Sequence, residues 1–217
     1  MQYAHPWRPG ALRADGGAWP ARAATVVGVA EPTGRRVAWV TGASRGVGRG
    51  IAVALGHAGW QVYVTARSSA ARRTGHLPGT VEEAAAAVTA AGGQGVAVVC
   101  DHRDDAAVAA AAARIAAECG RLDLLVNNAW AGYERLNAGA WQEWNAPLWE
   151  QPLELFDAMF GSGVRAHYVA LVMCAPLLIA TPGSLAVTLS VAVPESEQHK
   201  ALPVAALAAR YGIDVTS

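Results

Sequence analysis

Short apolar runs separated by longer, Ala-rich segments make up most of the chain from residue 37 onwards. The runs are Val37–Val40, Trp60–Thr65, Gly95–Cys100, Leu122–Val126 and Ser184–Ser190. Most of their residues suit a pleated strand, and the runs are largely continuous rather than alternating with polar positions, which is typical of parallel strands buried on both faces. The pattern therefore predicts a mostly parallel sheet of five strands.

Segments of helical length lie between these runs. They are Val47–Leu55, Val81–Ala91, Ala106–Glu118 and Leu153–Ile179. Glycine follows the second and third segments, as is common where a helix ends, and Pro176 is expected to break or bend the fourth. The alternation predicts an α/β fold, namely a three-layer, Rossmann-like, doubly wound and mostly parallel sheet that is incomplete at the C-terminus.

Three glycines follow the first strand and lead into the first helix. They stand at Gly42, Gly46 and Gly48, a GxxxGxG spacing. A strand, a glycine turn and a helix together direct free backbone N–H groups and the positive helix end at a phosphate. Glycine is needed because a Cβ would keep the backbone away from a diphosphate. The turn predicts a dinucleotide site, and the absence of GxxxxGK[ST] here argues against a P-loop NTPase.

The first 34 residues differ from the rest in composition. Prolines and glycines are frequent there and no steady hydrophobic period runs through them, so we expect residues 1–34 to be a disordered extension. The alternative is a secretion signal at Arg22–Ala30, whose apolar part is short and interrupted. Residues 35–217 are expected to form one dinucleotide-binding domain, which is an ordinary size for a single core.

The motif Thr41-Gly-Ala-Ser-Arg-Gly-Val-Gly48 resembles the cofactor motif of the short-chain dehydrogenase/reductase family. Asp101 after the third strand and Asn127-Asn128-Ala129 after the fourth also stand at the family's places, and the resemblance covers roughly Val37 to Ser190. It implies a nicotinamide dinucleotide at the C-terminal edge of the sheet. The implied cofactor-binding residues are Thr41, Gly42, Ser44, Arg45, Gly46, Val47, Gly48, Arg67, Asp101, His102, Asn128 and Ala129.

In the family this aspartate lies beside the adenine, and the asparagines hold the central strand ends and the nicotinamide ribose. The residues alone leave plainer alternatives open. Asp101 suits a turn or a helix N-cap, a role for which Asp104 and Asp105 compete, and Asn127-Asn128 suits an ordinary turn.

The end of the second strand carries information about the cofactor. It reads Ala66-Arg67-Ser68-Ser69, with no acid to accept a ribose 2′-hydroxyl, whereas an arginine accommodates a 2′-phosphate. Arg45 in the glycine turn supplies a second guanidinium, whose planar fork suits phosphate. The alternative is that both are solvated surface arginines. The sequence therefore predicts NADP(H) in preference to NAD(H).

The resemblance also implies a catalytic Tyr followed four residues later by Lys, and the chain has no YxxxK. The tyrosine would act as general acid and base, and the lysine would lower its pKa and hold the ribose. The remaining catalytic candidates are Ser190, at or beside the family's serine, and Lys200, with Ser196 at the tyrosine's place. A strand-end serine and a surface lysine are the alternatives. Gly161 stands at about the place of the family's active-site asparagine.

Two further segments bear on the substrate and the chemistry. Trp130–Trp149 is an aromatic insertion that resembles the loop of the family's dehydrogenase/reductase member 1 type. Its aromatics would either wall an apolar substrate pocket or pack against a partner subunit. Ala205–Ser217 resembles the family's late helix turning into the sixth strand. This match leaves too little chain after Ser190 for the usual catalytic loop.

Composition limits the partners. Lys+Arg and Asp+Glu balance at 17 each in 217 residues, so no basic surface for nucleic acid or anionic membrane is indicated. Three separated cysteines and six scattered histidines predict no disulfide and no metal site, and they favour a reducing, cytoplasmic location. The apolar run Val169–Ala180 is too short to span a membrane. The resemblance implies a homo-oligomer through the 153–179 helix.

Two functions remain open. The first is an NADP(H)-dependent oxidoreductase that moves hydride between the nicotinamide and a small carbonyl or secondary alcohol. The second is a catalytically inactive nucleotide-binding or partner subunit, or a gene fragment, on the same scaffold. The cofactor motifs support both equally. The missing Tyr–Lys pair favours the second, and the family resemblance favours the first.

Overall fold

Five parallel strands form the sheet in the computed structural model, which describes residues 34–74, 77–130, 143 and 146–189, all within the unit Glu31–Ser217. The strands are β1 (Val37–Thr41), β2 (Gln61–Ala66), β3 (Gln94–Val99), β4 (Leu124–Asn127) and β5 (Leu185–Thr188). Their order is β3-β2-β1-β4-β5, and every neighbouring pair is parallel. The order reverses between β1 and β4, which is where sheets of this kind bind ligands.

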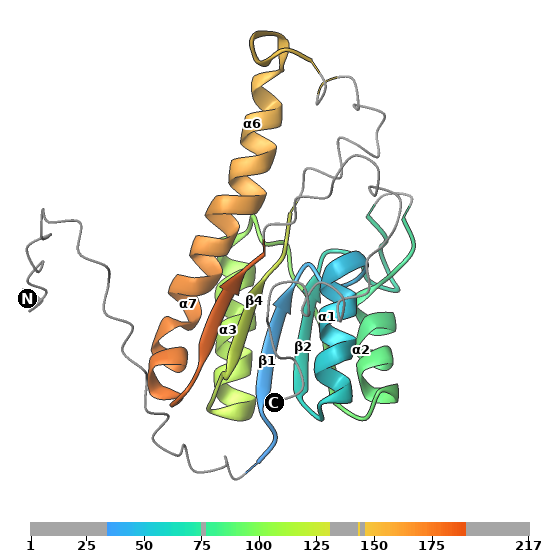
Figure 1. Cartoon of the computed structure of the whole chain (residues 1–217), viewed down its shortest axis with the longest axis vertical. Coiled ribbons are helices and arrows are strands. Elements are labelled where there is room, and N and C mark those ends of the chain that lie inside the picture. The colour runs from blue at the N-terminus through green and yellow to red at the C-terminus, as the bar shows by residue number, and fades with distance from the viewer. Residues whose placement is uncertain (1–33, 75–76, 131–142, 144–145, 190–217) are drawn as a thin grey trace, which may run out of the picture. The chain divides into compact units, whose positions relative to one another are not determined.

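Helices cover both faces of the sheet (Figure 1). They are α1 (Gly46–His57), α2 (Val81–Ala90), α3 (Asp105–Cys119), the short 3-10 turn η1 (Leu148–Glu150), α6 (Leu153–Met159), the π-helical segment η2 (Phe160–Arg165) and α7 (Ala166–Ala180). Helices α1 and α2 pack on one face, and α3 and α7 pack on the other. This arrangement confirms the predicted three-layer, doubly wound fold.

Alternate residues of the central strands supply the two halves of the core, because successive side chains of a strand point to opposite faces. Val40 and Val64 pack with α1 and α2, whereas Trp39, Tyr63 and Leu125 pack with α3 and α7. The two large aromatic residues are fully buried, and their polar atoms are paired. Trp39 Nε1 donates to Thr65 Oγ1 at 2.9 Å, and the Tyr63 hydroxyl lies 2.6 Å from a carboxylate oxygen on α3.

The cysteines behave as small core residues. Cys100 and Cys174 are buried, and burial raises the pKa of the Cys100 thiol to about 12 and that of Cys174 to about 11. Thiols with such pKa values are poor nucleophiles near neutral pH. Cys119 is partly buried, with its sulfur 3.2 Å from the Tyr63 hydroxyl.

The long helix departs from the prediction in one respect. It continues through Pro176 to Ala180, and its irregular part is instead the π-helical segment η2, around Gly161 and Gly163. By length and composition alone, the whole helix Leu153–Ala180 could cross a membrane, unlike its shorter apolar run Val169–Ala180. One such helix is weak evidence for a membrane protein, because the core helices of other proteins have the same length and composition. In this helix, 33% of the most apolar window is buried inside the protein.

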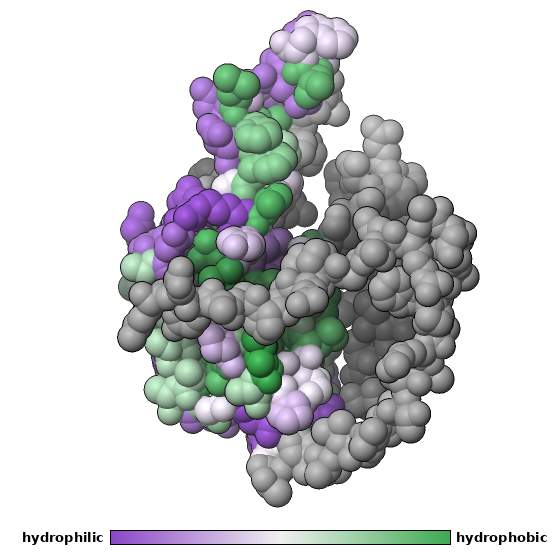
Figure 2. Space-filling model, turned by 90° about the vertical axis from the view of Figure 1, so that its left-hand side faces the viewer, coloured by the Kyte–Doolittle hydropathy of each residue, from purple (hydrophilic) through white to green (hydrophobic). Residues whose placement is uncertain are grey.

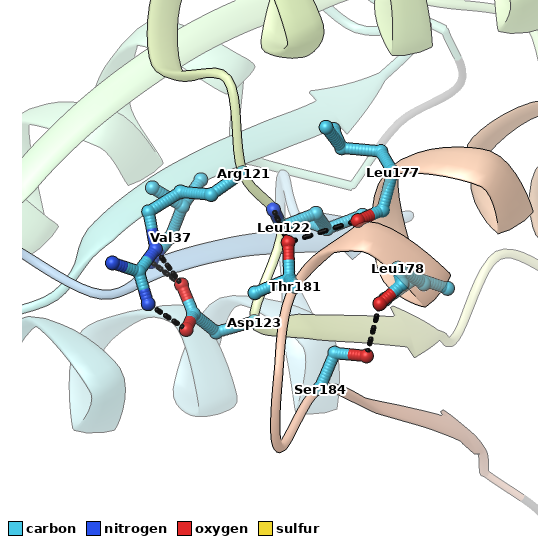
Figure 3. A network of polar contacts seen from close by, with 8 residues as sticks. All are labelled: Val37, Arg121, Leu122, Asp123, Leu177, Leu178, Thr181 and Ser184. Atoms are coloured by element: carbon cyan, nitrogen blue, oxygen red, sulfur yellow. Dashed lines mark hydrogen bonds and ion pairs between the residues drawn. The ribbon is translucent and has the colours of Figure 1, made fainter. Parts of the chain in front are cut away.

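Asp123 ties the starts of β1 and β4 together at the edge of the sheet opposite the glycine turn (Figure 3). Its carboxylate accepts from the Val37 backbone N–H at 2.8 Å and from Arg121 Nε at 2.9 Å. The Asp123 side chain is only 10% exposed, so water competes little for these hydrogen bonds.

Thr181 and Ser184 close the end of α7 onto the same edge (Figure 3). Thr181 Oγ1 accepts from the Leu122 N–H at 3.1 Å and donates to the Leu177 carbonyl at 2.8 Å. Ser184 Oγ donates to the Leu178 carbonyl at 2.7 Å. These side chains satisfy carbonyls that the end of a helix leaves without a partner.

Replacing Asp123 with alanine is expected to lower the free energy of unfolding by about 2 kcal/mol, since it leaves a buried N–H and a half-buried guanidinium without their charged acceptor. Urea unfolding measures this loss. The control is Arg114→Ala, which removes an exposed ion pair with Glu118 and should cost about 0.5 kcal/mol or less. Equal losses in the two variants would contradict the role given to Asp123.

Candidate functional site

The glycine turn lies directly against the end of β4. Gly42 has φ +66°, and a Cβ built on it would lie 2.7 Å from the Ala129 Cα. A Cβ on Gly48 would lie 2.8 Å from the Gly42 carbonyl oxygen. Gly46 has φ +57°, and no described residue lies within 4 Å of its Cβ direction, so this side is open toward the described part of the chain. The turn needs glycine on its inner side for packing and leaves its outer side free for a ligand.

Helix α1 begins without a side-chain cap, unlike its neighbours. Thr80 caps α2 by accepting from the Glu83 N–H at 3.1 Å, and Asp104 caps α3 by accepting from the Ala106 N–H at 2.9 Å. At α1 the N-cap residue is Arg45, which makes no such bond, and the first turn holds no acid. The N–H groups at the start of α1 thus keep a positive end with no acidic side chain to balance it.

Thr41 and Asn128 hold the glycine turn in place. Thr41 Oγ1 accepts from the backbone N–H groups of Asn128 at 2.9 Å and Ala129 at 3.0 Å. In return, Asn128 Nδ2 donates to the carbonyls of Thr41 at 2.9 Å and Gly42 at 3.2 Å. Thr41 is almost fully buried. These four bonds join the ends of β1 and β4 at the reversal of strand order.

Arg45 reaches from the glycine turn to the end of β2. Its Nη2 donates to Ser68 Oγ at 2.6 Å and to the Gly79 carbonyl at 3.4 Å. Burial lowers the pKa of the Arg45 guanidinium, and the charge of Arg73 lowers it further. The structure therefore brings Arg45 to the strand end that carries Arg67.

Several arginines lie near Asp101 in this corner. Burial lowers the pKa of the half-buried Arg67, the charge of Asp101 opposes that effect, and the charges of Arg103 and Arg45 add to it. Asp101 forms an ion pair with Arg103, which donates to it from Nη2 at 2.8 Å and from its backbone N–H at 3.0 Å. Arg103 is also the main cause of the lowered pKa of the Asp101 carboxyl. The corner thus holds more positive than negative charge, an arrangement that favours an anion.

His102 points into the core rather than to the surface of the site. Its Nε2 lies 2.9 Å from Thr65 Oγ1, its ring is 6.1 Å from that of Trp39, and its Nδ1 has no hydrogen-bond partner in the described part of the chain. Burial lowers the pKa of His102 to about 4. Any contact of His102 with an adenine would have to come from its backbone.

Asn127 and His167 join the end of β4 to α7. Asn127 Nδ2 donates to the His167 carbonyl at 3.4 Å, and His167 Nε2 donates to the Ala129 carbonyl at 2.8 Å. Asn127 Oδ1 is buried and has no partner within the ranges that the structure covers. His167 was not among the predicted site residues, and the signal that could have found it is a histidine among the apolar residues of α7.

Trp130 lies against the π-helical segment η2. A Cβ on Gly163 would lie 3.1 Å from Trp130 Cδ1, whereas a Cβ on Gly161 would have no described residue within 4 Å. Gly163 is buried and Gly161 is not. That Gly161 stands at about the place of the family's active-site asparagine stays a prediction. The structure shows that Gly163, two residues later, is the glycine that lies against Trp130.

Other predicted residues are placed as follows. Ser44 is buried in the glycine turn, and Val47 is partly exposed in the first turn of α1. Ser190, Lys200, the N-terminal extension, most of the aromatic insertion and the Ala205–Ser217 tail lie outside the described residues. Within the described residues, no group of three or more His, Cys, Asp and Glu side chains could hold a metal ion.

Comparison with known proteins agrees with this geometry. The sequence profile of the family described as short chain dehydrogenase matches residues 36–206, beyond the Ser190 limit of the motifs quoted above. The chain belongs to the short-chain dehydrogenase/reductase family. Human dehydrogenase/reductase SDR family member 1 is 38% identical over 164 residues, which are 75% of this chain. This confirms the resemblance to that type.

Solved structures of other short-chain dehydrogenases/reductases are similar in fold. One, a short-chain dehydrogenase from Mycobacterium thermoresistibile, is 33% identical, with TM-score 0.61, over 82% of this chain and 59% of that chain. Another, a metagenomic short-chain oxidoreductase in complex with NADP, is 30% identical, with TM-score 0.57, over 82% and 72%. The chain spans about half of its human relative, 48% of that protein's length.

Acid is expected to destabilise this short-chain dehydrogenase/reductase through His102. The pKa of this side chain is 6.5 when unperturbed and about 4 in the fold, so between these values the unfolded state binds the proton and the folded state does not. Its contribution is therefore complete above about pH 6.5 and falls by about 3 kcal/mol as the pH drops to 4.

Urea unfolding of wild type and His102→Gln from pH 7.5 to 4 measures this contribution. The variant should lose markedly less stability over that range than wild type does. His57→Gln, at an exposed histidine ending α1, is the control and should follow wild type. A His102→Gln curve parallel to wild type would contradict the assignment.

Proposed function

We propose that this chain binds NADP(H) along the C-terminal edge of its sheet and moves hydride between the nicotinamide and a small carbonyl or secondary alcohol. The observation that carries the proposal is the uncapped start of α1 behind the glycine turn, with Arg45 and Arg67 at the neighbouring strand end. Residues 35–217 would form the dinucleotide-binding domain, after a disordered extension of residues 1–34. The free cysteines support a reducing, cytoplasmic location.

The residues present fit the cofactor. The open side of Gly46 and the N–H groups that begin α1 suit the diphosphate, because neither a Cβ nor a capping side chain fills that space. Asn128 and Ala129, braced by Thr41, lie at the strand end where the nicotinamide ribose would be held. Asp101 stands near the adenine end, and His102 would contribute there through its backbone only.

Preference for NADP(H) follows from the charges around the end of β2. The charge of Arg45 lowers the pKa of Arg67, and Asp101, whose charge raises it, is already paired with Arg103. A 2′-phosphate would balance this excess of positive charge, whereas the 2′-hydroxyl of NAD(H) would not. The relative with NADP bound is consistent with this preference.

The cofactor supplies the hydride chemistry, and the protein must supply a proton donor or acceptor for the substrate oxygen. Ser190 is proposed to hydrogen-bond that oxygen and Lys200 to contact the ribose, with Trp130 beside the substrate. Because the sequence has no YxxxK, a second candidate function is a subunit that binds the nucleotide without turnover.

The affinities for NADPH and NADH test the proposed coenzyme preference. We expect NADPH to bind at least about 10-fold tighter than NADH, and Arg67→Gln to weaken NADPH by about 10- to 100-fold with little effect on NADH, since one charge-assisted bond to phosphate is lost. Energy transfer from the tryptophans to NADPH follows the titration. Arg114→Gln, an exposed arginine late in α3, is the matched control. Equal loss for both coenzymes would refute the 2′-phosphate assignment.

Turnover separates the two functions. With NADPH bound, a panel of aldehydes and ketones is assayed by the loss of nicotinamide absorbance. Reduction of any member, abolished by Ser190→Ala, supports the oxidoreductase. Tight binding without turnover supports the nucleotide-binding subunit. Failure to bind either coenzyme would end both proposals.

The helix Leu153–Ala180 is proposed to pair with its copy in a homo-oligomer. Hydrophobic side chains gather along its outer side (Figure 2) at helical spacing. They include Leu153, Phe156, Phe160, Val164 and Tyr168, all exposed, and the rings of Phe156 and Phe160 stack with centroids 4.0 Å apart. Contiguous exposed apolar surface often marks a protein–protein contact.

Val164→Glu is expected to convert the oligomer to monomer, because the new charge would be buried at the paired helices. Light scattering coupled to size-exclusion chromatography gives the mass of each variant. The control is Val99→Glu, at an equally exposed valine on the edge strand β3, which should keep the wild-type mass. A monomeric wild type, or an unchanged mass for Val164→Glu, would overturn this assignment.

A further inference from the structure

Ser68 is the residue that holds the Arg45 guanidinium, although its place in the sequence marks it only as the second residue after β2. Its hydroxyl oxygen accepts from Arg45 Nη2 at 2.6 Å and from the Thr74 backbone N–H at 3.1 Å. Its remaining neighbour is Thr74 Oγ1 at 2.5 Å. A serine hydroxyl has two acceptor sites and one proton. With both acceptor sites in use, the Ser68 proton goes to Thr74, and no capacity is left for a direct bond to a phosphate.

Gly79 holds the other side of the same guanidinium. Its carbonyl accepts from Arg45 Nη2 at 3.4 Å. Gly79 has φ +112°, and a Cβ built on it would collide with the Ser44 carbonyl oxygen and lie 3.2 Å from the Arg45 Cβ. The backbone at Gly79 therefore packs directly on the glycine turn, which only glycine permits.

The backbone of Ser68 also fixes where α2 begins. Its carbonyl accepts from the Val81 N–H at 3.0 Å, one residue after the N-cap Thr80. The residues that hold Arg45 are thus attached to the end of β2 and to the start of α2. They form a rigid support rather than an isolated surface contact.

This support leaves Arg45 both oriented and charged. Ser68 and Gly79 bind only Nη2 and are neutral acceptors, so among the described residues Nε and Nη1 keep their donors and no carboxylate pairs with the Arg45 charge. A carboxylate in the place of Ser68 would orient the arginine equally well but would cancel its charge. Fixing a guanidinium in advance reduces the entropy lost when an anion binds.

We propose that Ser68 and Gly79 are positioning residues that set the preference for a 2′-phosphorylated coenzyme by holding Arg45, without touching the phosphate themselves. This inference rests on the proposed binding of NADP(H). It differs from a direct phosphate contact by Ser68, because a residue that acts through Arg45 loses its effect once Arg45 is gone.

A double-mutant cycle tests the difference. Ser68→Ala is expected to weaken NADPH by about 10-fold and NADH by less than about 2-fold, since only one phosphate contact is disturbed. In an Arg45→Gln background, adding Ser68→Ala should change the NADPH affinity by less than about 2-fold. Additive losses in the cycle would mean that Ser68 binds the phosphate itself and would overturn the proposal.

The neighbouring serine provides a matched control. Ser69 Oγ accepts from the Arg72 N–H at 3.1 Å and makes no hydrogen bond with Arg45. Ser69→Ala should therefore leave the ratio of NADPH to NADH affinity unchanged. Gly79→Ala displaces the support from its other side and should lower the ratio as Ser68→Ala does. If thermal unfolding shows that Ser68→Ala folds poorly, Gly79→Ala takes its place in the double-mutant cycle with Arg45→Gln.

One measurement needs no coenzyme. The Arg45 Nε–H order parameter, assigned by comparison with Arg45→Gln and measured by NMR relaxation, should be high in wild type and in Ser69→Ala but lower in Ser68→Ala. An unchanged order parameter in Ser68→Ala overturns the positioning role even if NADPH binds as proposed. Loss of order in Ser68→Ala together with no coenzyme binding by wild type would instead keep the positioning role of Ser68 and refute the NADP(H) function.

Discussion

The close approach of the glycine turn to the end of β4 is the constraint on which the site depends. Gly42 and Gly48 have no room for a Cβ, because Ala129 and the turn's own backbone occupy that space. Thr41 and Asn128 then join the two strand ends with four hydrogen bonds. The polar groups on the inner side of the turn are therefore already hydrogen-bonded within the protein. The outer side, which includes Gly46 and the start of α1, is left for an anion.

Along the rest of this sheet edge, too, some polar groups pair within the protein and others are left for a ligand. At the end of β2, Ser68 and Gly79 use neutral oxygens to hold Arg45, so its charge is kept. At the start of α3, Asp104 caps the helix, and Asp101 instead pairs with Arg103. At α7, His167 donates to the carbonyl of Ala129 and so supports the end of β4 from the opposite face. Groups that would compete for a bound nucleotide are thus occupied by structural partners.

The parts of the fold that the sequence predicted well are those decided by local pattern. Continuous apolar runs identified all five strands, since a buried parallel strand tolerates few polar residues. The glycines at 42, 46 and 48 also predicted the turn from local pattern alone, because a cluster of glycines indicates a backbone that has no room for side chains. The site was predicted less completely. Nothing local distinguishes Gly161 from Gly163, and only packing shows that Gly163 is the one that lies against Trp130.

The orientation of His102 shows the same limit. Its position after β3 predicted a cofactor-binding residue, but a residue at a strand end can turn either way, and Thr65 and Trp39 offer it partners inside the core. Ser68 was visible in the sequence, yet its role depends on Arg45, which lies 23 residues earlier and meets it only when β1 and β2 pair. Contacts of this kind arise from topology, so no local pattern announces them.

Cofactor geometry and catalysis are physically separable in this chain. The corners proposed for a diphosphate and a 2′-phosphate are built from β1, α1, β2 and the end of β4, whose residues brace one another. Proton transfer would require a group with a suitable pKa next to the substrate oxygen, and a serine hydroxyl in place of the family's phenol is far too weak an acid to act alone. If the chain is an active oxidoreductase, its proton must come from a different group. If it is not, the same braces are sufficient to keep a nucleotide-binding protein folded and selective.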